Sequence, residues 1–309
     1  MTLAMLCPGQ GSQAVGMGRA LLSHHPVFDE MLADAGARMS VDLGRVVRKG
    51  PARLLQSTRV AQVAIFVFSA GIGRILHAAG VRFRMAAGHS LGEISALHLA
   101  GAIRFDDALD LVIARAAAME HANALSPGGM AAVSGAWTEE CGEICATAGI
   151  TVCNFNAPTQ TVISGDVAAL AQAEAALRAA GLRVTRLDVA GAYHSPLMAP
   201  AVPMFEEALA RCPMHEPRIP VLSNVTGAVI GSEDDLRREL LTQVTAPVLW
   251  KTCLSTMAAQ GASAFVEVGI GKQMRGLALQ NMPGATCLGT ASPGEIAAVV
   301  AVAAAEAAA

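Results

Sequence analysis

The chain has 309 residues, of which 53% are hydrophobic, 15% charged and 4% aromatic. An average soluble domain has roughly 25% charged residues. Because intrinsic disorder requires low hydrophobicity and high net charge, this composition excludes disorder, and it provides enough apolar side chains for a large core. The 22 Lys and Arg against 25 Asp and Glu give a net charge of -3. Without an overall positive field, a nucleic-acid partner is not expected.

Neither the longest apolar runs nor the N-terminus indicates a membrane protein. The uncharged run 60–73 is interrupted by Gln62 and followed by Arg74, and the alanine-rich tail contains two glutamates, so both are shorter than a membrane span. The first cation is Arg19, so no secretory signal is evident. Seven cysteines without a C-x-x-C pair predict free thiols in a reducing compartment. We therefore expect a cytoplasmic protein.

The first part of the chain alternates short apolar strands with helices. The run 3–7 predicts a buried strand, and the glycine-rich segment 8–12 predicts a tight loop. Ser57 is expected to cap a long helix that runs toward residue 80. The segment 85–87 predicts a short strand that leads into Gly88-His89-Ser90-Leu91-Gly92. A helix from there is expected to end near residue 101, and another to begin near residue 106.

The middle of the chain predicts the order β-α-β-β-α-β. The expected elements are a strand at 130–134, a helix at 138–148, strands at 151–155 and 161–164, a helix at 167–180 and a strand at 182–189. This order is the ferredoxin-like pattern, and it begins after the loop Ser126-Pro127-Gly128-Gly129. We therefore expect a small subdomain at 127–191, inserted into a larger α/β domain made of 1–126 and 192–309.

The larger domain is expected to resume at Ser195-Pro196, which suits a helix N-cap followed by proline at the first helical position. Strands near 219–223 and 264–268 would then rejoin the main sheet. Short strands that alternate with helices predict an α/β fold with a parallel sheet.

The strongest chemical motif is the G-x-S-x-G of residues 88–92. A short strand precedes it and a helical pattern follows it, which is the context of a nucleophile elbow. In such a turn the serine hydroxyl is exposed, and the N-terminus of the helix stabilises negative charge. Ser90 is therefore the candidate nucleophile.

A serine nucleophile needs a base, and eight histidines are available. His194 lies in a loop between a strand and a helix start, where functional residues often lie. His89 is adjacent to the serine, but neighbouring side chains diverge at an elbow, so it is expected to pack or hydrogen-bond locally. The other histidines have no distinguishing neighbours and are interpreted as structural: His24, His25, His77, His98, His121 and His215.

Arg115 lies in a helical pattern that is apolar on nearly every face. No carboxylate occurs at helical-neighbour spacing, although a guanidinium stays charged and its planar fork suits a carboxylate. From the residues alone, its anion is either a ligand or an acid distant in the sequence.

Other motifs do not indicate a nucleotide or a metal. Gly269-Ile270-Gly271 has Met274 where a dinucleotide fingerprint needs a third glycine, and the segment 8–12 lacks the G-K-[ST] ending of a phosphate loop. Cys141 and Cys145 lie one helical turn apart without a histidine pair nearby, so buried thiols are expected there. We expect no metal and no cofactor.

These motifs together resemble the malonyl-CoA:acyl carrier protein transacylases, the acyltransferase family of fatty acid and polyketide synthesis. The resemblance spans nearly the whole chain. The matching motifs are Pro8-Gly9-Gln10-Gly11-Ser12-Gln13, Gln62, Gly88-His89-Ser90-Leu91-Gly92-Glu93, Arg115, Asn156-Ala157-Pro158-Thr159-Gln160, Gly191-Ala192-Tyr193-His194-Ser195, Gln243 with Pro247 and Trp250, and Val266-Glu267-Val268-Gly269.

The resemblance implies a hydrolase-like α/β core with an inserted ferredoxin-like subdomain. It implies transfer of malonyl from malonyl-CoA to the phosphopantetheine thiol of an acyl carrier protein, through a malonyl-serine. Matched position by position, Ser90 is the nucleophile and His194 its base. Gln10 and the N–H of Leu91 form the oxyanion hole, and Arg115 binds the malonyl carboxylate.

The resemblance also implies that a main-chain carbonyl near Gln243 orients the histidine. No acid is therefore assigned to a triad, although Asp188 would be the candidate if one were used. Tyr193, Asn156 and Gln62 complete the expected substrate-binding residues, together with Gln243.

Two positions depart from the family's commonest pattern: Tyr193 replaces a phenylalanine, and Cys7 replaces an aromatic residue. Three alternative functions stay open. The chain could be the malonyl transferase subunit of malonate decarboxylase, which loads its own carrier protein. It could be a serine thioesterase or esterase, or a non-catalytic assembly subunit of the same fold.

Overall fold

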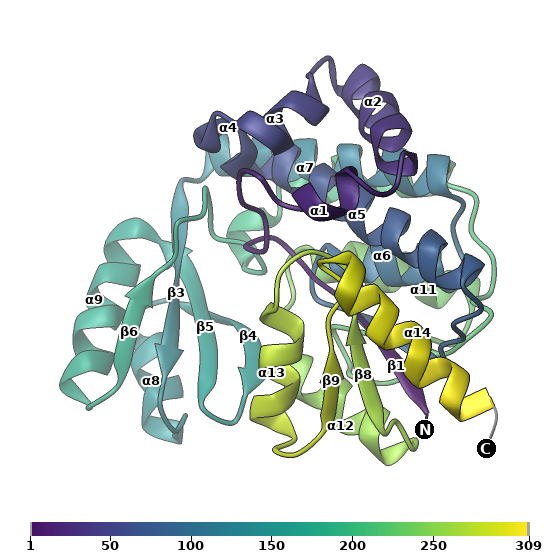
Figure 1. The fold of residues 1–309 in the computed structure, drawn as a ribbon. Helices are drawn as coiled ribbons and strands as arrows, with labels where there is room; N and C mark the ends of the chain where they lie inside the picture. Colours follow the sequence, from purple (N-terminus) through teal and green to yellow (C-terminus); the bar gives the residue numbers. More distant parts are fainter. Residues whose placement is uncertain (1, 308–309) are drawn as a thin grey trace.

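The computed structural model describes residues 2–307 and contains a five-stranded parallel sheet (Figure 1). Its strand order is β7-β2-β1-β8-β9. The strands are β1 (Leu3–Cys7), β2 (Met85–Gly88), β7 (Val221–Leu222), β8 (Ala264–Glu267) and β9 (Thr286–Leu288). β1 is buried at every residue because helices cover both faces of the sheet. The parallel sheet of the predicted α/β fold is therefore confirmed.

Alternate residues of β1 face two different groups of helices. Leu3, Met5 and Cys7 belong to a core cluster with the helices at 58–78, 92–99 and 105–125, whereas Ala4 and Leu6 belong to a cluster with the helices at 250–259 and 273–281. The core helices are α1 (Arg19–Leu22), α2 (Val27–Met39), α3 (Leu43–Lys49), α4 (Ala52–Gln56), α5 (Thr58–Ala78), α6 (Gly92–Leu99), α7 (Phe105–Leu125), α10 (Ala201–Arg211), α11 (Glu233–Gln243), α12 (Trp250–Ala259), α13 (Gln273–Asn281) and α14 (Pro293–Ala307).

The second sheet has four antiparallel strands in the order β4-β5-β3-β6. Its elements are β3 (Gly128–Ser134), α8 (Glu139–Thr147), β4 (Thr151–Ala157), β5 (Gln160–Asp166), α9 (Val167–Ala179) and β6 (Arg183–Arg186). The order of elements and strands confirms the ferredoxin-like subdomain. β6 is four residues long, shorter than the expected 182–189. The subdomain boundaries at 127 and 191 stay a prediction.

The antiparallel sheet is joined to the larger unit along β4. The N–H of Phe155 donates to the carbonyl of Val248 at 2.9 Å, and the N–H of Val248 donates to the carbonyl of Cys153 at 2.9 Å. The Asn281 side chain of α13 also donates to the carbonyl of Asn156 at 2.8 Å. Figure 1 shows β4 beside α13 at this junction.

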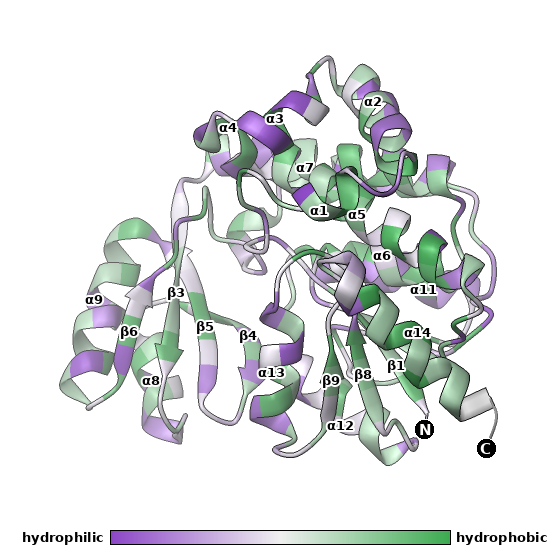
Figure 2. Ribbon diagram, in the orientation of Figure 1, coloured by the Kyte–Doolittle hydropathy of each residue, from purple (hydrophilic) through white to green (hydrophobic). Residues whose placement is uncertain are grey.

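Helix α5 is long and apolar enough to cross a bilayer by length and composition, which corrects the expectation that this segment is too short. However, 83% of its most apolar window is buried. It packs against α2, α6 and α7, and Figure 2 shows its hydrophobic residues inside that layer. Its apolar character therefore reflects its position in the core.

Two predicted helix starts differ in detail from the structure. Ser57 precedes α5, but its hydroxyl donates to the carbonyl of Leu54 at 2.8 Å and does not cap the helix. Ser195 does accept the N–H of Leu197 at 3.3 Å, but the turn it caps is a short 3-10 helix, Pro196–Met198. The α-helix that follows begins only at Ala201. All seven cysteines are free thiols, as expected.

Candidate active site

Ser90 lies in a sharp turn between β2 and α6. Its φ is 54°, a left-handed conformation that is strained for a residue other than glycine. The glycines on either side of it are sterically required. A Cβ on Gly88 would lie 1.8 Å from the carbonyl oxygen of Gly92, and a Cβ on Gly92 would lie 2.2 Å from that of Cys7. The predicted elbow is therefore present, between the carboxyl end of a strand and a helix N-terminus.

The turn is held by Asn224, which follows β7. The N–H of Ser90 donates to Asn224 Oδ1 at 2.7 Å, and Asn224 Nδ2 donates to the carbonyl of Gly88 at 2.7 Å. Asn224 is fully buried. This residue was not predicted from the sequence. The available signal was a polar side chain directly after a predicted core strand, at the same sheet edge as the elbow.

His194 meets the serine from a distant part of the chain. The Ser90 Oγ to His194 Nε2 distance is 2.7 Å, and the other ring nitrogen, Nδ1, lies 2.8 Å from the carbonyl oxygen of Gln243. Because a carbonyl can only accept, Nδ1 carries the proton and Nε2 is left as the acceptor for the serine hydroxyl. His194 also has a positive φ, 57°.

The buried setting of His194 keeps its ring neutral. Only 2% of the residue is exposed. Burial and the nearby positive charge of Arg115 lower the pKa of His194 to about 3. The ring is therefore unprotonated at neutral pH, with the lone pair of Nε2 directed at the serine hydroxyl. Asp188, the alternative partner of this histidine, is exposed, and Nδ1 is already bonded to the Gln243 carbonyl.

Arg115 of α7 is 1% exposed and points at the serine. Its Nη2 donates to Ser90 Oγ at 3.2 Å and to Gln243 Oε1 at 2.9 Å, and its Nη1 donates to Gln62 Oε1 at 2.8 Å. Burial lowers the pKa of Arg115 to about 10, so the guanidinium stays charged at neutral pH. Within residues 2–307 it forms no ion pair, and its direct partners are neutral.

Gln62, which bonds Arg115, also lies close to Gln10. Gln62 is buried, and its Nε2 lies 3.5 Å from Gln10 Oε1, at the limit of a hydrogen bond. Gln10 follows β1, and a Cβ on the preceding Gly9 would lie 2.4 Å from the carbonyl oxygen of His89, so this loop crosses the elbow closely. Leu91 is the N-cap residue of α6, directly after the serine. The four site residues Gln10, Ser90, Leu91 and Gln62 are thus brought together.

The polar contacts of Tyr193 and Asn156 are made with residues other than Ser90, and one contact of Tyr193 is with Gln10. The Tyr193 hydroxyl lies 2.5 Å from Thr58 Oγ1 and 3.3 Å from Asn123 Nδ2. Asn156 Oδ1 lies 2.8 Å from His89 Nε2. His89 also packs edge-on against Trp250, with ring centroids 5.3 Å apart. His89 thus packs and hydrogen-bonds and is not the partner of the serine, as expected, although its hydrogen-bond partner comes from the antiparallel sheet.

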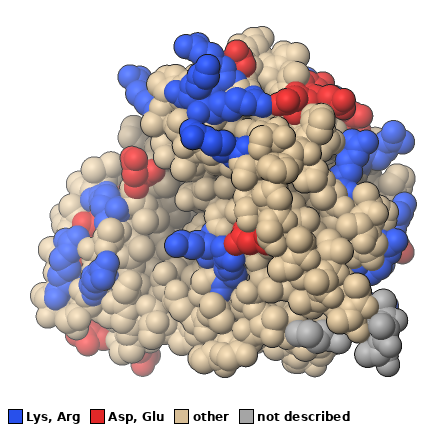
Figure 3. Space-filling model, viewed as in Figure 1, with Lys and Arg blue, Asp and Glu red and all other residues tan. Residues whose placement is uncertain are grey.

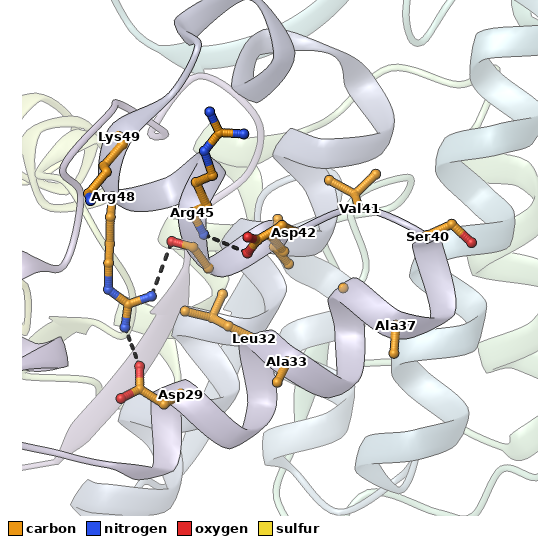
Figure 4. Close-up of a pocket in the computed structure, with 13 residues that line it drawn as sticks. Asp29, Leu32, Ala33, Ala37, Ser40, Val41, Asp42, Arg45, Arg48 and Lys49 are labelled. Atoms are coloured by element: carbon orange, nitrogen blue, oxygen red, sulfur yellow. Dashed lines mark hydrogen bonds and ion pairs between the residues drawn. The ribbon is translucent and has the colours of Figure 1, made fainter.

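Other hollows and charged regions of the protein lie apart from Ser90, His194 and Arg115. A groove of about 870 Å³ separates α2 from α3, and none of its lining residues is a predicted site residue (Figure 4). Arg48 of α3 reaches across it to Asp29 of α2 and also donates to the carbonyl of Gly44 on its own helix. Figure 3 shows Lys and Arg side chains gathered over α3 and α4. In the part of the chain that the structure describes, no three His, Cys, Asp or Glu side chains gather as a metal site would require.

Comparisons with known proteins agree with this geometry. A family model described as an acyl transferase domain matches residues 4–308. A malonyl CoA-acyl carrier protein transacylase of Escherichia coli is 38% identical over 280 residues, which is 89% of this chain and 91% of that protein.

Solved structures give the same result. The malonyl-CoA:acyl carrier protein transacylase of Xanthomonas oryzae superposes with a TM-score of 0.93 at 36% identity, covering 98% of this chain and 99% of that one. A malonyl-transacylase solved in complex with a type II polyketide acyl-carrier protein has a TM-score of 0.93 at 31% identity, covering 98% and 100%. The chain belongs to the family of malonyl CoA-acyl carrier protein transacylases.

Proposed function

We propose that this protein transfers a malonyl group from malonyl-CoA to the phosphopantetheine thiol of an acyl carrier protein, through an ester on Ser90. The observation that carries the proposal is the position of Ser90 Oγ. It lies 2.7 Å from the unprotonated nitrogen of His194 and 3.2 Å from the Arg115 guanidinium. One hydroxyl thus has both a base and a cation that can fix a carboxylated substrate.

In the first half-reaction His194 Nε2 accepts the Ser90 proton while Oγ attacks the thioester carbonyl. The bond from Oγ to the carbonyl carbon forms, the carbon–sulfur bond breaks, and coenzyme A leaves with the proton from His194. The hydrogen bond from Nδ1 to the Gln243 carbonyl keeps the ring oriented. No acid is needed to hold the neutral ring in this tautomer.

Gln10 and the N–H of Leu91 are assigned as the donors that stabilise the negative charge of the tetrahedral intermediate. Leu91 begins the first turn of α6, where the helix dipole favours an anion. One preorganised donor of this kind contributes about 3 to 4 kcal/mol to the transition state. The close crossing of the Gln10 loop over the elbow supports this assignment.

The malonyl carboxylate is assigned to Arg115. The amide oxygens of Gln62 and Gln243 accept hydrogen bonds from Nη1 and Nη2 of the guanidinium. These neutral partners orient the guanidinium of Arg115 and do not neutralise its charge. A carboxylate can therefore bind the guanidinium bidentately. We assign Gln62 and Gln243 to substrate binding through this effect. Tyr193 and Asn156 are assigned to the walls of the same site.

In the second half-reaction the thiol of the carrier's phosphopantetheine arm gives its proton to His194 and attacks the malonyl ester. The new carbon–sulfur bond forms, and Ser90 leaves with the proton from His194. Neither step requires a redox cofactor. We place the reaction in the cytoplasm, and the seven free thiols support a reducing compartment.

A transfer assay distinguishes this function from its alternatives. The protein is mixed with malonyl-CoA and purified carrier proteins, including that of malonate decarboxylase, each with and without the phosphopantetheine arm. Malonylation of an armed carrier supports transfer, and the preferred carrier identifies the pathway. Steady release of free malonate with no carrier malonylated would indicate a thioesterase or esterase instead. A protein that neither transfers nor hydrolyses malonyl would be an assembly subunit.

A further inference from the structure

Glu93 is a fully buried carboxylate in the first turn of α6, three residues after Ser90. Both of its oxygens accept hydrogen bonds from residues distant in the sequence. Oε1 accepts the backbone N–H of Asn224 at 2.8 Å, and Oε2 accepts Nε2 of Gln243 at 2.5 Å. The transfer mechanism above gives this residue no part, yet a buried carboxylate is costly unless it is well bonded.

The first bond connects Glu93 to the nucleophile. Asn224, whose main chain binds Glu93, uses its side chain to hold the N–H of Ser90 and the carbonyl of Gly88, each at 2.7 Å. Glu93 therefore fixes the residue that maintains the strained turn at the serine.

The second bond connects Glu93 to the base and to the cation. Gln243 accepts His194 Nδ1 on its main-chain carbonyl and accepts Arg115 Nη2 on Oε1. Because Nε2 of Gln243 donates to Glu93 and also to the carbonyl of Ser90 at 3.0 Å, its amide can present only oxygen to Arg115. The orientation of the Gln243 amide thus depends on the Glu93 carboxylate.

The charges around Glu93 come from two other helices. Arg115 of α7 bonds Gln243, which in turn bonds Glu93, and Glu239 of α11 is a charged neighbour of the Glu93 carboxylate. Glu239 accepts Ser223 Oγ at 2.6 Å and the N–H of Val225 at 2.9 Å. Burial and the charge of Glu239 raise the pKa of Glu93 well above its usual value. Glu93 therefore holds a proton more readily than an exposed carboxylate would.

We propose that Glu93 is a positioning residue for malonyl transfer, which holds Asn224 and Gln243 and through them aligns Ser90, His194 and the carboxylate-binding face of Arg115. This inference rests on the proposed function. Its specific consequence concerns selectivity. The link to Arg115 passes through one amide oxygen, so loss of Glu93 should impair a carboxylated acyl donor more than an uncharged one.

Glu93→Gln tests this consequence with little change of volume. The new side chain keeps one oxygen but replaces the other with an NH₂ group, and it still faces two donors. If the amide of Gln243 turns over to relieve the clash, its NH₂ group faces the Arg115 guanidinium. Glu267→Gln is the matched control. Glu267 is also fully buried and accepts the N–H groups of Met274 and Arg275, but it touches none of the site residues.

The rates of Ser90 acylation by malonyl-CoA and by acetyl-CoA are measured on each protein, with circular dichroism to verify the fold. Absence of malonyl loading in the wild type would contradict the proposed function itself. Given wild-type loading, we expect the malonyl to acetyl rate ratio of Glu93→Gln to fall at least about tenfold, and that of Glu267→Gln to stay within about twofold of wild type. An unchanged ratio in folded Glu93→Gln, or an equal fall in the control, would overturn the proposal.

Gln243→Met keeps the proposal falsifiable if Glu93→Gln does not fold. Methionine keeps the length of the side chain and the main-chain carbonyl that accepts from His194, and it removes only the amide between Glu93 and Arg115. We expect the same fall in the malonyl to acetyl ratio. A wild-type ratio in this variant would show that Arg115 is aligned without the amide, and would overturn the proposal.

Discussion

Ser90 and His194 both adopt left-handed backbone conformations, with φ of 54° and 57°. Each such conformation costs about 1–3 kcal/mol and persists only where surrounding contacts enforce it. At Ser90 the enforcing contact is the Asn224 side chain. His194 is held by the Gln243 carbonyl at one ring nitrogen and by Ser90 at the other. The strain brings the two side chains to hydrogen-bonding distance.

Arg115→Ala should reverse the acyl preference of the protein. Removal of the guanidinium eliminates the proposed partner of the malonyl carboxylate, so acylation by malonyl-CoA should fall by at least about a hundredfold. Acylation by acetyl-CoA should fall far less, because acetyl has no carboxylate. Parallel measurement of the two rates checks this. An unchanged preference would contradict the assignment of Arg115.

The rate of transfer, measured as kcat/KM, should not decrease as the pH falls through 6.5, the ordinary pKa of histidine. Since burial and Arg115 lower the pKa of His194 to about 3, the ring stays neutral as the pH falls. Activity is present above that pKa and is lost as the pH falls through it. Therefore kcat/KM should stay flat from about pH 7 to about pH 5.

Arg115→Met provides the control for this prediction. Without the positive charge the pKa of His194 should rise toward 6.5, and the acidic limb measured with acetyl-CoA should move up in pH. An acidic limb near 6.5 in the wild type would contradict a neutral, buried base.

At the residue scale, sequence patterns singled out the serine and the arginine, because each stood out locally. His194 was the preferred histidine for its loop position, and the family resemblance made it the base. Arg115 was conspicuous as a cation in an apolar helix. Its partners Gln62 and Gln243 could be named only through the family resemblance, and Asn224 was not found. A neutral amide makes no pattern along the chain, and its role depends on contacts that only the fold creates.

At the scale of elements, the site depends on the crossing of the Gln10 loop over the elbow. Gly9, Gly88 and Gly92 lie where a Cβ would meet a backbone oxygen at 2.4, 1.8 and 2.2 Å. Backbone atoms cannot move aside as a flexible side chain can. The small residues of the two motifs therefore determine how closely β1 and α6 approach.

Gly92→Ala should destabilise the protein by about 2 kcal/mol or more, because the methyl group would overlap the carbonyl of Cys7. Gly142→Ala on α8 is the matched control. A Cβ there meets nothing within 4 Å, and alanine is favoured over glycine in a helix by about 0.5–1 kcal/mol. Denaturant unfolding of both variants measures the difference. A Gly92→Ala protein as stable as wild type would contradict the close crossing.

Element order was predictable where apolar runs and turn residues were clear, as in the β-α-β-β-α-β segment. Two strands, β7 and β9, were harder to predict. The strand near 219–223 is only Val221–Leu222, and β9 was not predicted. Edge strands this short carry too little pattern, and their pairing with the sheet decides their existence.

At the scale of the whole molecule, the two sheets share backbone hydrogen bonds through Val248, and α13 reaches β4 through Asn281. The chain has two tryptophans, Trp137 beside α8 and Trp250 in the larger core. Because the contacts at β4 are backbone pairs as well as side-chain pairs, we expect the two sheets to unfold together.

Urea unfolding of Trp137→Phe tests this coupling. Fluorescence then reports on Trp250 in the larger core, and far-UV circular dichroism reports on all helices and strands. We expect coincident midpoints. A first transition seen only by circular dichroism would show that the antiparallel sheet unfolds alone.

The charge-poor composition has a clear counterpart in the folded molecule. With 15% charged residues, most of the chain can be buried, and long apolar helices such as α5 lie in the core. Some charged residues are nevertheless buried, and Arg115, Glu93 and Glu239 are among them. Composition predicted the core, but only the fold shows that Arg115 and Glu93 lie beside the elbow and that Glu239 lies near Glu93.

The most direct test of the account is the mass of the intact protein after brief exposure to malonyl-CoA. We predict one malonyl adduct per chain, mapped by peptide analysis to Ser90, absent from Ser90→Ala, and removed on addition of an armed carrier protein. A malonyl adduct on another residue, or unchanged labelling of Ser90→Ala, would contradict Ser90 as the nucleophile.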